Sequence, residues 1–248
     1  MGIFIKNDSQ VALMRTACQI CVRAHELLAK YIKPGITTEE LSKIAEEYIR
    51  SEGATPSFLG YRGFPGAICT SVNDQVIHGI PGLTRIKSGD IISIDIGVCY
   101  KRFHGDAART HPVGTVDAES LRLIDVARES FFEGMRYAQK GCHLHEISAA
   151  IGDYVEAQGF SVVQEWCGHG IGRQLHEDPS IPHTRQDNRG PRLTKGMTLA
   201  VEPMINIGSH ELSMLDDTWT VITRDGKNSA HYENTILITT GDPEILTL

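Results

Sequence analysis

Apolar residues recur along the chain with two different periods, which predict both helices and strands. The stretch 9–32, SQVALMRTACQICVRAHELLAKYI, has apolar residues at helical spacing and predicts a long helix that is buried along one face. Isoleucines and a valine occupy every second position of 92–98, and Ser93, Asp95 and Gly97 lie between them. This alternation predicts a strand with one apolar face and an acid on the other face.

The same helical pattern occurs twice at an offset of about 106 residues. The segments YIKPGITTEELSKIAEEYIRSEGA (31–54) and YAQKGCHLHEISAAIGDYVEAQGF (137–160) match at tyrosine, glycine and glutamate positions. Each predicts a glycine turn, an amphipathic helix and a glycine stop. The segments KSGDIISID (87–95) and TKGMTLAVE (194–202) then match as apolar strands that each end on an acid.

These matches predict a fold with internal pseudo-two-fold symmetry. We expect two related α+β halves, approximately 10–110 and 115–240, and no Pro/Ser-rich linker separates them. We therefore expect a single domain over 1–248, in which a central antiparallel sheet is flanked by helices. Equivalent strands would meet near the axis, so Asp95 and Glu202 should converge there.

Composition narrows the class of protein. The formal net charge of -7 argues against a surface that binds nucleic acid throughout, and no apolar run reaches the roughly 18 residues of a membrane span. The first residues are polar too early for a signal peptide, so we expect a cytoplasmic protein with reduced cysteines. Cys18 and Cys21 form a lone C-x-x-C at helical spacing, which we interpret as helix-packing thiols.

The acids of residues 91–110, IISIDIGVCYKRFHGDAART, are the first candidates for chemistry. A hairpin turn at Tyr100 and Lys101 would make Asp95 and Asp106 direct cross-strand neighbours, with Cβ atoms roughly 4.5–5.5 Å apart. Like charges in that position destabilise a sheet unless a cation or a shared proton lies between them. The geometry leaves three alternatives: a metal site, two solvated acids, or a proton-sharing pair.

The second half of the chain favours the metal. His169 and His176 lie in the Gly-rich segment WCGHGIGRQLHEDP, and Glu202 ends an apolar strand. The segment WTVITRDGKNSAHYENTILIT predicts a hairpin around Asp225 and Gly226 that carries Glu233 on its return strand. Each of these residues alone has an ordinary structural explanation, as a core histidine or a surface acid.

Together the candidates form one histidine and four carboxylates, which could balance two divalent cations. Such ions lie about 3.5–4 Å apart and activate a bridging water as a nucleophile for amide or phosphoester hydrolysis. An imidazole ligand favours Mn, Fe, Co or Zn over Mg and Ca. The chain has no P-loop, so an amide substrate is favoured over a phosphoester.

These residues also resemble a known family. Asp95, Asp106, His169, Glu202 and Glu233 occur in the order of the metal ligands of methionine aminopeptidases, within the motifs IDIG, HGDAART, CGHGIGRQLHEDP, VEPM and YENT. Several motifs are shared with the clan of prolidases and creatinase, whose pseudo-two-fold architecture is called the pita-bread fold. The segment NDQVIHGIPG and the compact length resemble the bacterial-style type I enzymes over nearly the whole chain.

The resemblance implies roles for these residues. Asp95 would bind one metal ion, Asp106 and Glu233 would bridge both, and His169 and Glu202 would hold the other. Glu202 would also be the general base for the bridging water. His78 and His176 would contact the scissile peptide. The catalytic residues would then be these two histidines and Glu202. A monovalent cation near Asn73, Gln75 and Ser229 is also implied.

The implied substrate is the N-terminal initiator methionine of nascent proteins and peptides whose second residue is small. Its side chain would lie in an apolar pocket, for which the matching positions are Phe58, Tyr61, Phe64, Trp166, Leu175 and Trp219. Phe58, Phe64, Trp166 and Leu175 depart from the commonest bacterial residues at these positions, as does Arg62. The family expectation is a monomer without membrane or specific nucleic-acid partners, and transient contact with the ribosome is compatible with it.

Two other functions fit parts of this pattern. A prolidase or Pro-specific aminopeptidase shares the fold, but such chains usually carry an additional N-terminal domain that is not visible here. A non-catalytic relative that binds RNA or the ribosome would tend to lose metal ligands, whereas all five matching positions are filled.

Overall fold

The computed structural model describes residues 2–248 and contains helices and strands in the order that the pattern predicts. The helices are α1 (Asp8–Ala29), α2 (Thr38–Ser51), α3 (Ala118–Met135) and α4 (Leu144–Ala157), with a 3-10 turn at Tyr61–Gly63. The strands are β1 (Thr55–Pro56), β2 (Cys69–Val72), β3 (Gln75–Ile77), β4 (Ile91–Tyr100), β5 (Phe103–Pro112), β6 (Ser161–Val162), β7 (Gly168–Gly170), β8 (Glu177–Ile181), β9 (Thr198–Val201), β10 (Met204–Asn206), β11 (Leu212–Met214), β12 (Val221–Thr223), β13 (Ser229–His231), β14 (Glu233–Leu237) and β15 (Glu244–Ile245). Over these residues no helix is both long and apolar enough to cross a bilayer.

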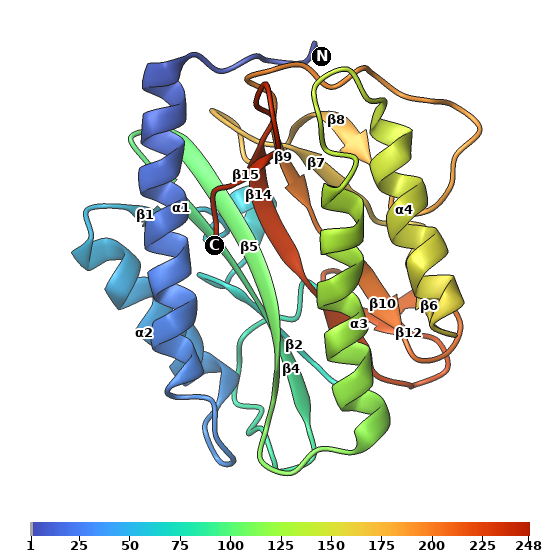
Figure 1. The fold of residues 1–248 in the computed structure, drawn as a ribbon. Coiled ribbons are helices and arrows are strands. Elements are labelled where there is room, and N and C mark those ends of the chain that lie inside the picture. Colours follow the sequence, from blue (N-terminus) through green and yellow to red (C-terminus); the bar gives the residue numbers. More distant parts are fainter. Residues whose placement is uncertain (1) are drawn as a thin grey trace.

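The largest sheet runs through the middle of the molecule in the order β1-β4-β5-β14-β9-β7-β8, and its strands pair antiparallel (Figure 1). Strand β5 of the first half pairs with β14 of the second half at the centre. Strand β4, which carries Asp95, and strand β9, which ends just before Glu202, flank this central pair. The predicted α+β class with a central antiparallel sheet is therefore confirmed.

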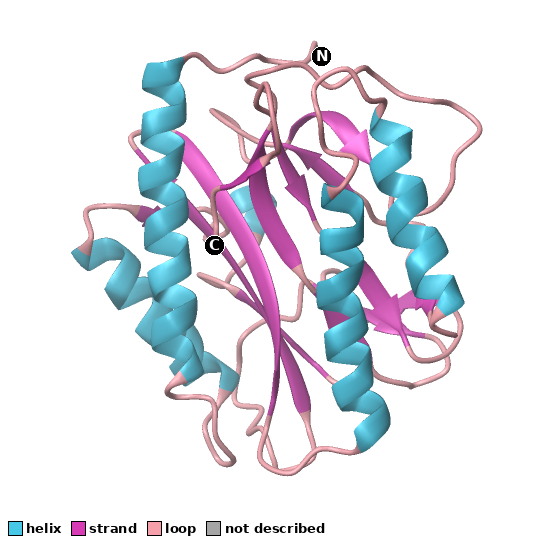
Figure 2. Ribbon diagram, viewed as in Figure 1, coloured by secondary structure: helices cyan, strands magenta, loops and turns pink. Residues whose placement is uncertain are grey.

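Helices cover one face of this sheet (Figure 2). The apolar residues of β4, including Ile92, Ile94 and Ile96, form a fully buried core with α1 and α2, and a second core joins α3 and α4 to the other half of the sheet. Cys18 and Cys21 are both fully buried on α1, which confirms that they pack the helix against the sheet. The apolar positions of β4 thus face the helices, which leaves Asp95 on the opposite face.

The hairpin β4–β5 differs from the predicted register. Its turn lies at Lys101 and Arg102, one residue later than expected, and the strands pair Gly97 with Asp106. Asp95 pairs with Ala108, so the prediction that Asp95 and Asp106 are direct cross-strand partners was wrong. They are diagonal neighbours on the same face, because a turn shifted by one residue moves the pairing by two and preserves the face.

The hairpin predicted around Asp225 and Gly226 was also wrong. A tight turn occurs there, but β12 before it pairs with β3 and β11. After the turn, β13 pairs with β10, and β14, which carries Glu233, joins the central sheet. The chain therefore passes from one sheet to another at this turn instead of folding back on itself.

Matched positions of the two halves adopt matching conformations. Gly35 and Gly141 have φ of 100° and 97°, and Gly89 and Gly196 have φ of 101° and 89°. In the first turn of the second helix of each half, a glutamate accepts a hydrogen bond from the backbone N–H three residues earlier. The division of a single domain into duplicated halves at about residues 110–115 stays a prediction.

Gly97, which pairs with Asp106 across the hairpin, has no room for a side chain because the segment of Ser57 and Phe58 packs against it. A Cβ atom on Gly97 would lie 2.6 Å from Cε1 of Phe58 and 2.8 Å from Cβ of Ser57. We expect Gly97→Ala to lower the free energy of unfolding by about 1–3 kcal/mol, because buried groups must move to admit the methyl group. Denaturant titration measures this change, and Gly241→Ala, with no neighbour within 4 Å of its Cβ, is the matched control. Equal effects of the two substitutions would contradict the packing argument.

Candidate active site

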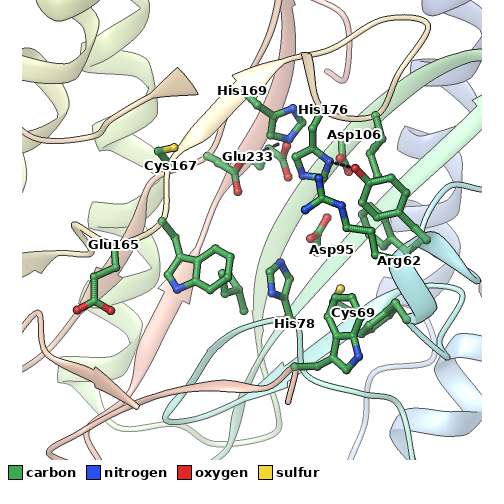
Figure 3. Close-up of a pocket in the computed structure, with 18 of the residues that line it drawn as sticks. Arg62, Cys69, His78, Asp95, Asp106, Glu165, Cys167, His169, His176 and Glu233 are labelled. Atoms are coloured by element: carbon green, nitrogen blue, oxygen red, sulfur yellow. Dashed lines mark hydrogen bonds and ion pairs between the residues drawn. The ribbon is translucent and has the colours of Figure 1, made fainter. Parts of the chain in front are cut away.

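The five predicted metal ligands come from neighbouring strands and lie around one cavity of about 390 Å³. Figure 3 labels Asp95, Asp106, His169 and Glu233 around this cavity. Asp95 lies on β4, Asp106 on β5, His169 on β7, Glu202 directly after β9, and Glu233 at the start of β14. None is on a helix. The central sheet therefore brings together residues that are up to 138 positions apart in the sequence.

The ligand atoms are close enough to share ions. One atom each from Asp106, His169 and Glu233 lie within 4.8 Å of one another. Nε2 of His169 is 3.5 Å from Oε1 of Glu202, which is too long for a hydrogen bond and typical of two atoms that bind the same ion at roughly 2.0–2.2 Å. Asp95 lines the same cavity but belongs to no such compact set among the described residues.

The pKa values of the four carboxylates are raised. Burial raises the pKa of Asp106 to about 7. Burial, and then the charges of Asp106 and Glu202, raise the pKa of Asp95 well above its usual value, and the pKa values of Glu202 and Glu233 are raised for the same kinds of reason. Such a group of buried acids cannot all ionise without a compensating positive charge.

Several oxygen atoms of these acids have no partner. Within residues 2–248, Oδ1 of Asp95, Oδ1 of Asp106 and Oε1 of Glu233 are buried and accept no hydrogen bond. An unpaired buried carboxylate oxygen is costly, whereas divalent cations bound in this cavity would compensate these oxygens. The donor set of carboxylates and imidazole therefore fits divalent metal ions.

The imidazole of His169 is in the neutral form that binds a metal ion. Burial, and then the nearby His176, lower its pKa to about 3. Its Nδ1 is 2.9 Å from the carbonyl oxygen of Gly170, so Nδ1 carries the proton and donates it to that carbonyl. This tautomer leaves the lone pair of Nε2 directed at the carboxylates.

The two other predicted catalytic histidines line the same cavity. His78 follows β3 in a left-handed conformation with φ of 58°, and burial lowers its pKa to about 4. His176 precedes β8, and its Nδ1 is 2.9 Å from the hydroxyl of Tyr61. Its pKa is also lowered to about 4, by desolvation and then by the charge of Arg62. Both rings are therefore neutral near pH 7 and can donate from one nitrogen.

An apolar wall completes the cavity. All six predicted pocket residues line it: Phe58, Tyr61, Phe64, Trp166, Leu175 and Trp219. The rings of Phe64 and Trp219 pack edge to face at 5.2 Å, and that of His78 packs edge to face on Trp166 at 5.0 Å. The carboxylates thus share one cavity with a surface that suits an apolar side chain.

Some residues of the site were missed by the sequence analysis. The further lining residues are Arg62, Cys69, Ile77, Glu165, Cys167, Met214 and Thr218, of which only Arg62 had been noted. His231 is buried, and its Nε2 is 3.6 Å from Oε2 of Glu202, opposite His169. His231 lies two positions before Glu233, so strand alternation could have placed both on one face. His183, which accepts the backbone N–H of Glu202, carried no comparable signal.

The residues of the expected monovalent-cation site lie close together. The backbone N–H of Ser229 donates to the carbonyl oxygen of Asn73 at 2.9 Å. The side chain of Gln75 accepts the backbone N–H of Val72 at 2.9 Å. Binding of a monovalent ion there stays a prediction.

Comparison with known proteins gives consistent matches over the full chain. Residues 12–240 match the model of metallopeptidase family M24. A methionine aminopeptidase from Clostridium perfringens is 54% identical over 246 residues, and methionine aminopeptidase 1 from Bacillus subtilis is 51% identical over 245 residues. Each alignment covers 99% of both chains.

A solved structure matches the fold equally well. The crystal structure of methionine aminopeptidase from Rickettsia prowazekii superposes with a TM-score of 0.97 at 38% identity, and 100% of each chain is covered. This match confirms the predicted pita-bread class. The bacterial relatives also agree with the predicted type I short form.

Proposed function

Because the chain belongs to metallopeptidase family M24, we propose that it is a methionyl aminopeptidase, which removes N-terminal methionine by metal-dependent hydrolysis. One observation carries this proposal: the unpaired carboxylates and the six-residue apolar wall line the same cavity. An apolar first side chain could therefore bind while its peptide bond lies beside the acids. Two divalent ions, when bound, would polarise the peptide carbonyl and lower the pKa of a water molecule.

We assign the roles of the protein's own groups from their positions. Asp95, Asp106, His169, Glu202 and Glu233 would hold the ions. The two oxygens of Glu202 lie 3.5 Å and 3.6 Å from Nε2 of His169 and of His231, and Glu202 would accept the proton of the attacking water.

The two remaining histidines would act on the substrate. The hydroxyl of Tyr61 fixes one nitrogen of His176, so the other is free to contact the scissile peptide. His78, neutral and edge-on to Trp166, would donate to the same peptide from the opposite side of the cavity. Together these donors would stabilise the oxyanion that forms during hydrolysis.

The expected activity is release of free methionine from Met-Ala-Ser in the presence of Co, Mn or Fe. We expect kcat/KM for Met-Ala-Ser to exceed that for Met-Leu-Ser by at least about tenfold, because the second side chain must also enter the cavity. Quantification of free methionine by mass spectrometry measures both rates. No release with full metal occupancy would contradict the proposal, and cleavage of Xaa-Pro but not Met-Ala would favour a prolidase.

The proposal extends to the cellular role. We propose that the substrates are N-termini of nascent chains, that the protein acts in the cytoplasm as a monomer, and that its contact with the ribosome is transient. Light scattering after size exclusion should give a mass near 27.3 kDa.

A further inference from the structure

Arg62 is a charged residue at the cavity that the proposed mechanism does not use. Its side chain is exposed and lines the cavity together with His176. Figure 3 shows it extending from its backbone toward His176, and its charge contributes to the lowered pKa of that ring. The guanidinium therefore lies at the side of the site where the peptide bond would be cleaved.

The backbone holds Arg62 in an unfavourable conformation. Its φ of 50° lies in the left-handed region, which glycine or asparagine adopts more easily than arginine. The N–H of Gly60 donates to the carbonyl of Phe64 at 2.8 Å, and the N–H of Phe64 donates to that of Tyr61 at 2.9 Å, so a closed turn surrounds the residue. A strained residue in a rigid turn beside a cavity indicates a role for its side chain.

The guanidinium of Arg62 has no acidic partner among residues 2–248. The guanidinium lies over the ring of Tyr61, at 5.5 Å from guanidinium carbon to ring centroid. Among the residues that line the cavity, the exposed Glu165 is the other charged residue outside the group of four acids. Figure 3 shows it across the cavity from Arg62, with its carboxylate turned away. Arg62 thus presents five free N–H donors in a planar arrangement that suits a carboxylate.

We propose that Arg62 selects peptide substrates that carry a carboxylate beyond the scissile bond. This inference rests on the proposed aminopeptidase function. When the first side chain of a peptide packs against the apolar wall, the residues after the scissile bond would pass Arg62. The carboxylate can come from an acidic side chain at the third or fourth residue, or from the C-terminus of a short peptide. An exposed ion pair of this kind gives about a two- to fivefold preference.

The test compares matched peptides on the metal-loaded enzyme. Met-Ala-Xaa-Gly amides and Met-Ala-Gly-Xaa amides, with Asp, Asn or Lys as Xaa, vary the side-chain charge alone. Met-Ala-Ser as free acid and as amide varies the C-terminal charge. We expect the wild type to prefer one acidic member by about two- to fivefold in kcat/KM, through a lower KM. The preference should weaken from 0.05 to 0.5 M salt, because ions screen an exposed pair.

Three variants decide the origin of this preference. Arg62→Gln should abolish it by raising KM for the acidic peptide only, and Arg62→Lys should retain part of it. Arg173→Gln is the matched control, because Arg173 also lies over an aromatic ring, that of Phe103 at 5.1 Å, and does not line the cavity. It should leave the preference unchanged.

The outcomes separate this inference from the proposed function. Equal rates for acidic and neutral peptides in the wild type, a preference that survives in Arg62→Gln, or a uniform loss on all peptides in that variant would overturn the selective role of Arg62. A failure of the wild type to hydrolyse any of these peptides would instead overturn the aminopeptidase function. A preference seen only for the free-acid tripeptide supports the inference and identifies the C-terminal carboxylate as its source.

Discussion

Replacing Glu202 by glutamine should lower kcat for Met-Ala-Ser by about 10²- to 10⁴-fold without unfolding the protein. Glutamine has the same shape but cannot accept the proton of a water molecule at neutral pH, and loss of a positioned general base costs this much. It also removes one negative charge from the acid cluster. Steady-state kinetics at saturating metal measures the loss, and circular dichroism checks the fold.

Two comparisons make this result specific. Glu211→Gln removes an equivalent charge from an exposed residue that pairs with Arg224, so it should leave kcat unchanged. Glu202→Asp keeps the charge but shortens the side chain that lies between two histidines. It should therefore recover part of the activity. Full activity in Glu202→Gln would show that another group accepts the proton.

Divalent metal should stabilise the protein strongly, and more so at higher pH. At about 100 times its dissociation constant, a bound ion contributes about 2.7 kcal/mol, which corresponds to a Tm increase of roughly 5–10 °C for a chain of this size. The reason is that the metal compensates carboxylate oxygens that have no partner in the folded chain. Differential scanning fluorimetry with Mn or Co against a chelator measures this shift.

The pH dependence follows from the direction of the pKa shifts. The pKa values of the four cavity acids are raised on folding, that of Asp106 to about 7, so above pH 4 these acids hold more protons in the metal-free folded state than in the unfolded chain. The contribution of these acids to stability therefore falls as pH rises. The buried histidines, His169 among them, have lowered pKa values, so they act in the opposite direction, and this effect ends only above about pH 7.5, where the unfolded histidines have also lost their protons.

Between pH 7.5 and 8.5 the histidines are neutral in both states, so the raised pKa values of the acids dominate the trend. We expect the Tm of the metal-free protein to fall over this range, while the metal-loaded protein keeps its Tm because bound ions need ionised ligands. Asp106→Asn should flatten the metal-free trend and reduce the shift on metal addition. A metal-free Tm that rises from pH 7.5 to 8.5 would contradict the assignment of raised pKa values to these acids.

The sequence predicted the fold class and most of the site because both depend on local patterns. Strand alternation placed Asp95 on the face opposite the isoleucines, and the repeat placed Glu202 at the equivalent position of the other half. Both side chains line the same cavity. The family resemblance then added His78 and the apolar wall, for which local pattern gave no functional signal.

The errors concern contacts that local pattern does not determine. Lys101 and Arg102 form the β4–β5 turn with φ of 47° and 69°, yet neither is the glycine or asparagine that usually indicates such a turn. The position of the turn was therefore missed by one residue, although strand periodicity preserved the correct face. The pairing of β12 with β3 joins segments about 145 residues apart, so nothing near Asp225 could indicate it.

The most direct test of the metal site is anomalous diffraction from crystals of the protein loaded anaerobically with Mn or Co. The proposal predicts two anomalous peaks roughly 3.5–4 Å apart in the cavity, with ligand distances of about 2.0–2.2 Å. The ligands should be Asp95, Asp106, His169, Glu202 and Glu233. Loaded crystals with no peak at these residues, or with the ions bound elsewhere, would contradict the assignment of these acids as the metal centre.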